Sequence, residues 1–153
     1  MDVIPFHIGI TTDDLARSRA ELGIALNVGW TEPGAGPGAF MSVDGRPHPR
    51  PLSCISLQGP IHVDLMQGAS GTLWAAATPT LHHFGYWTDD LAGDIERLEG
   101  EGWSLELTRP DAEGRPSLFA YLVRADGFRL ELIDSAGKAD YQARLAKRAA
   151  SDA

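Results

Sequence analysis

The sequence predicts an α+β fold in which two tandem βαβββ modules form one cupped, mostly antiparallel eight-stranded sheet with helices outside. Three observations support this prediction: a ten-residue repeat, the same order of segments after each copy, and a length of 153 residues, which fits one domain. The repeat is His7-Ile-Gly-Ile-Thr-Thr-Asp-Asp-Leu-Ala16, which returns as His83-Phe-Gly-Tyr-Trp-Thr-Asp-Asp-Leu-Ala92 with seven identical positions at an offset of 76. We expect one domain over 1–134, with modules at about 5–67 and 81–134, and a polar C-terminal helix or tail over 135–153.

Each copy of the repeat begins with a strand. Side chains on a strand alternate between its two faces, so His7 is predicted to oppose Phe6, and His83 to oppose His82. The predicted sets are Phe6, Ile8 and Ile10 against His7, Gly9 and Thr11, and His82, Phe84 and Tyr86 against His83, Gly85 and Trp87. The repeat therefore predicts one histidine per module, at equivalent places on equivalent faces.

The Thr-Asp-Asp triplet in each copy is typical of a helix start. Thr12 or Asp13, and Thr88 or Asp89, are predicted to accept hydrogen bonds from the first, unpaired amides of a helix. The extra carboxylate favours the positive end of the helix dipole. We therefore interpret the paired aspartates as helix caps rather than catalytic groups. Apolar residues at helical spacing follow in both copies, namely Leu15, Leu22 and Leu26, then Leu91, Ile95 and Leu98, and Gly100 and Gly102 suit the end of the second helix.

The rest of each module reads as three further strands. The predicted strands are 29–32, 53–57 and 61–66 in the first module, and 103–108, 119–123 and 128–133 in the second. A long Pro/Gly-rich loop over 33–51 has too many helix and strand breakers for regular structure, and it is expected either to fold over a site or to be a surface excursion. A shorter loop at 109–116 is its counterpart.

Composition excludes several classes of function. The net charge of −8 disfavours nucleic acid as a partner, because phosphate binding needs a clustered basic surface. Cys54 is the single cysteine, so no intramolecular disulfide forms, and a reducing compartment is expected. No signal peptide and no apolar run of membrane-spanning length is recognised. We therefore expect a cytoplasmic protein that binds neither nucleic acid nor membrane.

Two carboxylates occupy equivalent places on the last strand of each module. At an offset of 67, Asp64 superposes on Glu131, and strand alternation puts both on the face opposite the helices. An ionisable residue in the middle of a strand is costly to bury without a partner. Two imidazoles with one or two carboxylates suit a divalent ion of zinc, nickel, cobalt, manganese or iron. The alternative is hydrogen-bonded strand histidines beside carboxylates at a solvated rim.

The paired βαβββ pattern, the repeated His-x-Gly-x-x-Thr-Asp-Asp-Leu-Ala and the segment Phe-Arg-Leu-Glu131-Leu-Ile resemble the vicinal oxygen chelate superfamily over residues 5–134. This group includes glyoxalase I, methylmalonyl-CoA epimerase, extradiol dioxygenases and bleomycin-resistance proteins. The resemblance implies a metal bound by His7, Asp64, His83 and Glu131. Asp64 departs from the usual Glu or Gln and is one methylene shorter; His62 shares its face and is an alternative ligand. Without Asp64, a two-histidine, one-carboxylate triad remains.

The resemblance implies a metal-dependent isomerase, epimerase or lyase that acts beside a carbonyl through an enolate-like intermediate, on a small-molecule or acyl-thioester substrate. Glu131, or Asp64 if it is not a ligand, would move the proton. Arg129 would hold an anionic or thioester group, or else pair with Glu131. The other candidate substrate-binding residues are His62, Trp87 and Tyr121.

Two alternatives stay open. The first is a ferrous extradiol-type dioxygenase that uses the three-ligand set, and the second is a metal-free protein that binds a drug or metabolite. Related proteins often pair, so a homodimer is expected, with the site either within one chain or across the interface.

Overall fold

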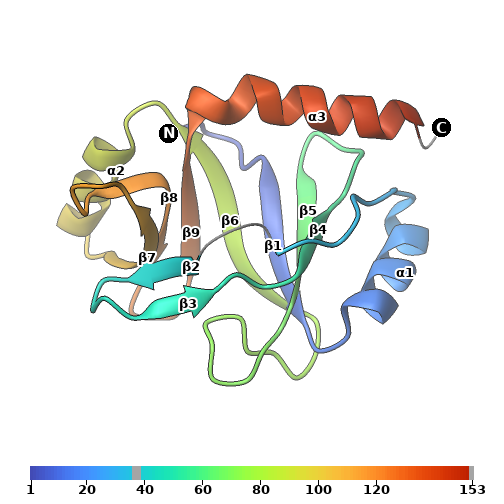
Figure 1. Ribbon diagram of the computed structural model, residues 1–153, viewed down its shortest axis with the longest axis horizontal. Helices are drawn as coiled ribbons and strands as arrows, with labels where there is room; N and C mark the ends of the chain where they lie inside the picture. Colours follow the sequence, from blue (N-terminus) through green and yellow to red (C-terminus); the bar gives the residue numbers. More distant parts are fainter. Residues whose placement is uncertain (36–38, 152–153) are drawn as a thin grey trace.

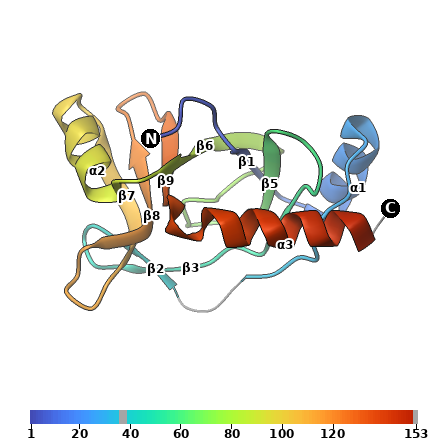
Figure 2. The ribbon, with the colours of Figure 1, turned by 90° about the horizontal axis from the view of Figure 1, so that it is seen from above.

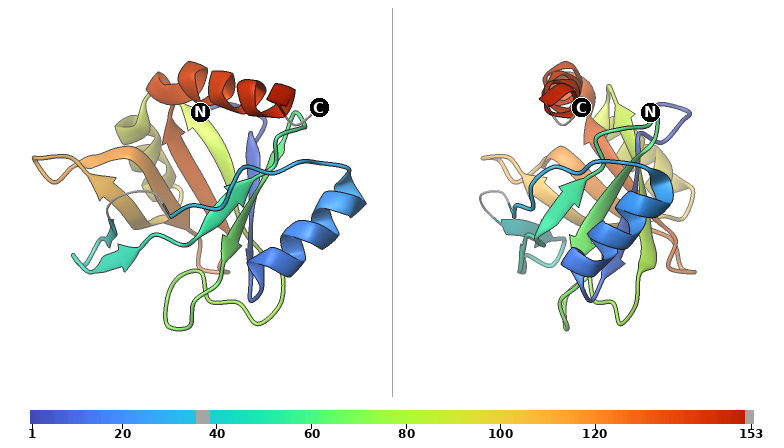
Figure 3. Two further views of the ribbon diagram at one scale, coloured as in Figure 1. Left: turned by 45° about the vertical axis from the view of Figure 1, so that its right-hand side comes forward. Right: turned by 90° about the vertical axis from the view of Figure 1, so that its right-hand side faces the viewer.

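A computed structural model describes residues 1–35 and 39–151, and Figure 1 shows its elements in chain order. All strands belong to one mixed sheet with the order β3-β2-β7-β8-β9-β6-β1-β5-β4, and the sheet curls into a half-barrel (Figure 3). The strands are β1 (His7–Thr12), β2 (Ala39–Ser42), β3 (Pro47–Pro49), β4 (Ser53–Ile55), β5 (His62–Gln67), β6 (Thr80–Thr88), β7 (Ser104–Pro110), β8 (Pro116–Val123) and β9 (Arg129–Asp134). The helices are α1 (Leu15–Leu26), α2 (Leu91–Gly100), a short 3-10 turn η1 (Ser135–Gly137) and α3 (Lys138–Ser151).

The repeated segments form the centre of the sheet. β1 and β6, which carry the two copies, pair with each other in antiparallel fashion. Each then pairs in parallel with the last strand of its own module, β1 with β5 and β6 with β9. The two modules therefore meet along their first strands, and the sheet is mixed while most of its neighbouring pairs are antiparallel.

The Thr-Asp-Asp triplets cap helices, but through a different residue than predicted. The second aspartate is the N-cap: Asp14 accepts from the Arg17 amide and Asp90 from the Gly93 amide, each at 2.9 Å. Thr12 and Thr88 accept instead from the amides of these two aspartates, each at 3.2 Å. The prediction of Thr12 or Asp13, and of Thr88 or Asp89, was one or two positions early, because each threonine side chain accepts from the amide of the second aspartate, which then caps the helix.

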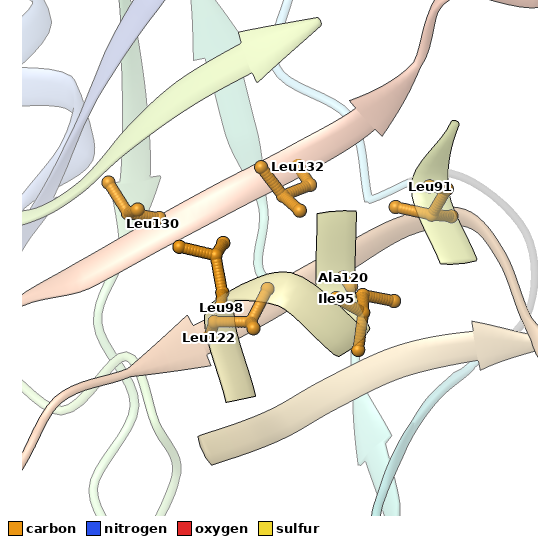
Figure 4. Packing of buried hydrophobic residues seen from close by; sticks show 7 residues of the cluster. All are labelled: Leu91, Ile95, Leu98, Ala120, Leu122, Leu130 and Leu132. Atoms are coloured by element: carbon orange, nitrogen blue, oxygen red, sulfur yellow. The ribbon is translucent and has the colours of Figure 1, made fainter. Parts of the chain in front are cut away.

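Helices α1 and α2 cover the outer face of the sheet, as the strand alternation predicts. Figure 4 shows Leu91, Ile95 and Leu98 of α2 over the leucines of β8 and β9, including Leu130 and Leu132. Leu15 of α1 packs likewise with Leu65 of β5, together with Trp30 and Cys54. Burial of the alternate apolar residues thus leaves Asp64 and Glu131 on the inner face.

The sheet has nine strands rather than the predicted eight, because one predicted strand is absent and two strands form within the predicted loop. Residues 29–32 form no strand and make only a bridge between Trp30 and Ser56. The segment 33–51, predicted to lack regular structure, contains the hairpin β2–β3, and residues 36–38 of it lie outside the described residues. β2 pairs with β7 of the other module, and its Phe40 packs with Trp74 and Phe119. Pairing with an unprotected strand edge outweighs the breaker residues.

Helix α3 does not lie outside the sheet with α1 and α2. Figure 2 shows it running across one end of the curled sheet, from β9 toward the side on which α1 lies. Its start is held by the pairing of Lys138 with Asp2 at 2.7 Å and by a hydrogen bond from Ser135 to Asp89. Leu145 is its buried residue, and Tyr141 packs against Phe6. None of the described helices is long and apolar enough to span a membrane.

Candidate metal centre

Three side chains from the two modules converge on the inner face of the sheet. Nε2 of His7 lies 2.7 Å from Nε2 of His83. The Oε2 atom of Glu131 lies 2.9 Å from the first of these nitrogens and 3.1 Å from the second. Both histidines are buried, and the Glu131 side chain is 13% exposed. The strands β1, β6 and β9 of one chain therefore supply all three groups.

The glycines of the repeat make this convergence possible. In the register of β1 and β6, His7 faces Gly85 and His83 faces Gly9. A Cβ atom at Gly85 would lie 2.1 Å from Cε1 of His7, and one at Gly9 would lie 2.1 Å from Cε1 of His83. Each imidazole therefore lies over the glycine of the other copy. Gly85 also neighbours Glu131 in the next strand, so its missing side chain lets His7 reach that carboxylate.

His82 contacts His83 through the ring nitrogen that points away from the triad. Its Nδ1 lies 2.9 Å from Nδ1 of His83, and its Nε2 lies 3.0 Å from the carbonyl oxygen of Leu73. Burial is the main cause that lowers the pKa of His82 to about 3, and the neighbouring His83 and Arg129 act in the same direction, so the His82 ring is neutral at pH 7. Because a carbonyl only accepts, Nε2 carries the proton and Nδ1 accepts from His83. This arrangement leaves the lone pair of the His83 Nε2 atom directed at the site.

The position of His82 corrects the predicted strand faces. Alternation placed it on the face opposite His83, but the register of β1 and β6 shifts between Gly9 and Ile10. Such a bulge inserts one residue and turns its side chain. The two adjacent histidines therefore contact each other at 2.9 Å.

His7 lacks an equivalent support. Its Nδ1 atom is buried and has no hydrogen-bond partner among the described residues. The residue before it is Phe6, whose ring meets the imidazole edge-on at 4.4 Å between centroids. An apolar contact fixes the ring plane of His7, but it does not set which nitrogen carries the proton.

The two equivalent carboxylates have opposite electrostatic surroundings. Burial disfavours the charged form of Glu131, but the two imidazoles that contact it, His7 and His83, outweigh burial and hold the pKa of that carboxyl well below its ordinary value. For Asp64, burial dominates over the attraction of the same two histidines and raises the pKa. Glu131 is thus a fixed anion, while Asp64 binds a proton more readily than an exposed aspartate.

Asp64 lies beside the triad but outside it. Among the described residues, the group whose ligand atoms lie within 4.8 Å of one another consists of His7, His83 and Glu131. Asp64 neighbours Gly9, over which the His83 ring lies, just as Glu131 neighbours Gly85. The register is therefore symmetric, and the shorter side chain of Asp64 is the difference. Its carboxylate lines the adjoining cavity.

The candidate substrate-binding residues lie in different places. Trp87 lines the cavity, buried and stacked on Phe6 at 4.3 Å between centroids. Tyr121 is buried against His83, and burial raises its pKa well above the ordinary value. Nδ1 of His62 lies 2.7 Å from the carbonyl oxygen of Ser56.

The fourth candidate, Arg129, pairs with a carboxylate, but not with Glu131. Its guanidinium binds both oxygens of Glu106, at 2.6 and 2.9 Å. It lies away from the large cavity, beside a smaller one that His82 and His83 also line.

The geometry of the triad fits a divalent ion. Ligand atoms at right angles around an ion, with bonds of ~2.1 Å, lie ~3.0 Å apart, close to the observed 2.7 to 3.1 Å. The carboxylate is ionised, and the neighbour of His83 directs a lone pair to the site. A divalent cation between these atoms would accept the lone pairs of both Nε2 atoms and of the carboxylate. The residues present therefore suit a metal, with His7, His83 and Glu131 as its ligands.

A cavity of about 680 Å³ opens from this site. His7, Asp64 and Glu131 lie on its inner side, and its walls include Phe6, Trp87 and apolar residues of β2, β4, β8 and β9. Tyr141, Arg144 and Arg148 of α3 also line it, as do Arg50 and Arg109. The arrangement places three candidate ligands and one further carboxylate beside a space large enough for a small molecule.

Comparison with known protein families matches residues 6–121 to the glyoxalase/bleomycin resistance protein/dioxygenase superfamily. The chain belongs to this superfamily. Among solved structures, a hypothetical protein from Bacillus halodurans C-125 is 15% identical with a TM-score of 0.60, covering 86% of this chain and 93% of its own. Methylmalonyl-CoA epimerase from Mycobacterium tuberculosis is 16% identical with a TM-score of 0.59, covering 88% and 92%. At these identities the likeness shows the fold. No curated protein matches the sequence.

Sequence reasoning missed two kinds of residue that shape this superfamily site. Gly9 and Gly85 stand in the repeat, and the shared spacing His-x-Gly was a visible signal that the opposite strand needs room there. His82 was assigned to the wrong face. The adjacent pair His82-His83 has no counterpart in the first copy, where Phe6 precedes His7. This difference between the two copies was a signal in the sequence that His82 has a role of its own.

Proposed function

We propose that this superfamily member is a divalent-metal-dependent isomerase, epimerase or lyase that moves a proton on carbon beside a carbonyl. One observation carries the proposal: three ligand atoms converge within 3.1 Å of one another on the inner side of a cavity that also holds the free carboxylate of Asp64. A metal-ligand set next to an unligated acid–base group is what proton transfer beside a carbonyl requires.

Each residue has a separate role. His7, His83 and Glu131 would hold the ion, which would supply a Lewis acid for negative charge on a carbonyl oxygen. Asp64 takes the proton from the neighbouring carbon; the C–H electron pair passes into the enolate-like intermediate, and the proton returns to carbon in the product. Its raised pKa brings this carboxyl closer to the range in which a general base works well. Trp87 and Phe6 form an apolar wall that excludes water from the reacting carbon.

The comparisons support this class without setting the substrate. A structural neighbour from Streptomyces coelicolor is described as methylmalonyl-CoA epimerase in complex with 2-nitronate-propionyl-CoA. An acyl thioester is therefore a first substrate to test.

A second candidate is a ferrous extradiol-type dioxygenase, and the three-ligand set favours it. Two histidines and one carboxylate with open positions are the arrangement of non-haem iron enzymes that activate oxygen. The same set appears here because Asp64 stands apart. The unligated carboxylate is used by the proton-transfer proposal and has no task in this one.

The deciding experiment compares metal, proton exchange and oxygen uptake in one preparation. The chain is purified without chelators, its metal is measured by mass spectrometry, and it is loaded in turn with cobalt, nickel, zinc, manganese and iron. Deuterium incorporation from D₂O into methylmalonyl-CoA and into an α-hydroxyketone is followed by NMR, and oxygen uptake with catechol by electrode. We expect metal-dependent exchange without oxygen uptake.

Glu131→Gln serves as the matched variant, since it keeps the size of the side chain while removing the charge. It should lose metal and exchange together. Iron-dependent oxygen uptake without exchange would favour the dioxygenase. Failure of every metal to bind would overturn both proposals and favour a metal-free binding protein.

Assembly and compartment stay predictions. A homodimer is expected in the cytoplasm, and light scattering after size exclusion tests the dimer. The described ligands all come from one chain, so a monomer would leave the proposed chemistry intact.

A further inference from the structure

The arginines of this chain divide into two groups. Arg50, Arg109, Arg144 and Arg148 have no carboxylate within ion-pair distance among the described residues, and all four line the cavity beside the triad. Every other arginine has a carboxylate partner: Arg17, Arg19, Arg46, Arg97, Arg115, Arg124 and Arg129. With a net charge of −8, carboxylates are in excess. The unpaired positive charge is therefore concentrated at one place.

Three separate parts of the fold bring these arginines together. Arg144 and Arg148 lie one helical turn apart on α3, on the same face as Tyr141, and this face lines the cavity. Arg109 belongs to β7, and Arg50 stands between β3 and β4. Figure 2 shows α3 crossing the end of the curled sheet.

The charges are graded with depth. Arg109, Arg144 and Arg148 are exposed, whereas Arg50 is half-buried, with its guanidinium carbon 4.9 Å from the centre of the Phe40 ring. His7, at the inner side, is 3% exposed. The cavity is thus lined by buried candidate ligands, by aromatic side chains and by more exposed guanidinium groups, together with the carboxylates of Glu32 and Asp64.

Four cations that line one space repel one another, and nothing within the described chain offsets this at ion-pair distance. A bound anion would remove the repulsion. Guanidinium groups suit this task because their planar forks bind the oxygens of carboxylate and phosphate two at a time. The same field would raise the local concentration of an anion that approaches an otherwise acidic protein.

We propose that the outer part of the cavity is an anion-binding subsite, and that the substrate carries a phosphate or carboxylate group beyond an apolar portion and the oxygens that meet the triad. The identity of the substrate as a whole rests on the proposed function. The anion subsite itself needs no metal, so it can be tested separately.

The test measures binding of three probes that share an aromatic ring and differ in charge: phenyl phosphate, phenylacetate and benzyl alcohol. Isothermal titration calorimetry uses the full chain after removal of metal by a chelator, so that no anion binds through an ion. We expect at least one anionic probe to bind at least ~10-fold tighter than the alcohol, with affinity that falls as salt rises. Whichever anion binds more tightly identifies phosphate or carboxylate as the preferred group.

Variants then locate the subsite. Replacing both helix residues, Arg144→Gln with Arg148→Gln, should weaken binding of the anion by at least ~10-fold, and Arg109→Gln alone should weaken it less. Arg46→Gln is the matched control, because Arg46 is exposed but pairs with Asp44 outside the cavity. It should leave binding unchanged. Circular dichroism checks that each variant is folded.

Equal affinity for the anions and the alcohol would overturn the proposal, and so would anion binding that the double variant leaves unchanged. Metal content, measured on the same variants, reports on the proposed function alone. A chain that binds these anions but no metal would support the subsite while removing the metal-dependent reaction. A chain that binds metal but not the anions would overturn the anion subsite and leave the metal-dependent reaction standing.

Discussion

The two modules of this protein place equivalent histidines in equivalent cradles but support them differently. His7 and His83 each lie over the glycine of the opposite copy. In the second module, the preceding residue is His82, which fixes the proton position of its neighbour by a hydrogen bond. In the first, it is Phe6, which packs on the ring and binds no nitrogen. The repeat thus sets where each candidate ligand lies, while the residue before it determines whether its Nδ1 atom has a hydrogen-bond partner.

The carboxylates show the same contrast. Asp64 and Glu131 hold equivalent registers, each beside a glycine that lies under a histidine. Glu131 reaches both imidazoles, and Asp64 is not part of the ligand group. One methylene therefore separates a ligand from a free carboxylate. In the proposed site, the symmetry of the backbone would allow four ligands, and the shorter side chain of Asp64 would reduce these to three ligands and a base.

The largest effect is expected from filling the cradles. Gly9→Ala and Gly85→Ala each place a Cβ atom 2.1 Å from an imidazole carbon, so the ring or the strand must move. Each should reduce metal affinity by more than ~100-fold, since a misplaced ligand is lost, and should lower the free energy of unfolding by about 1–3 kcal/mol. Cobalt titration and urea unfolding of the metal-free chain measure the two effects.

Gly100→Ala is the control for these substitutions, because a Cβ there meets no atom within 4 Å. It should leave cobalt affinity unchanged. If the two cradles are equivalent, Gly9→Ala and Gly85→Ala have similar effects; a large difference would show that one histidine matters far more than the other. Normal cobalt binding in both would contradict the cradle interpretation.

The second prediction separates the two carboxylates. Asp64→Asn should lower proton exchange by about 10²–10⁴-fold, the usual contribution of a general base, while cobalt content stays near that of the parent chain. Glu131→Gln should lose cobalt, and with it proton exchange. Asp64→Glu restores the missing methylene and should tighten cobalt binding if length alone keeps this carboxylate out. Loss of cobalt in Asp64→Asn would instead show that Asp64 is a ligand.

The third prediction makes the second module resemble the first. His82→Phe removes the acceptor for the Nδ1 proton of His83 and should weaken cobalt binding about 10–100-fold, as loss of such outer partners does. His82→Gln should recover part of the affinity, because its amide can accept from His83 and donate to the Leu73 carbonyl. The visible spectrum of bound cobalt reports ligand geometry directly. Unchanged affinity in His82→Phe would mean that the support of His83 comes from elsewhere.

Local patterns predicted much of this site. Alternation along a strand is set by backbone geometry, so it correctly placed Asp64 and Glu131 away from the helices that bury Leu65 and Leu132. The repeat correctly brought two histidines together. These inferences succeed because they depend on neighbours in sequence and on one internal symmetry.

Long-range features escaped prediction for a physical reason. The bulge that turns His82 toward His83 depends on how two strands align, which neither strand specifies alone. The hairpin β2–β3 owes its place to the free edge of β7, more than 60 residues later in the chain. The position of α3, which brings Arg144 to the cavity, likewise depends on packing with the distant Phe6 and Trp87.

The smallest expected effect concerns the helix caps, where the modules look most alike. Asp14→Ala and Asp90→Ala should each lower the free energy of unfolding by about 0.5–2 kcal/mol, because each leaves an amide of the first turn without its acceptor. Asp13→Ala should matter less, since it removes only an exposed pair with Arg17. Its counterpart Asp89 accepts from Ser135 at the start of η1. Asp89→Ala should therefore lower the free energy of unfolding in urea more than Asp13→Ala does. Equal losses would mean that the contact between Asp89 and Ser135 does not help to hold α3 in place.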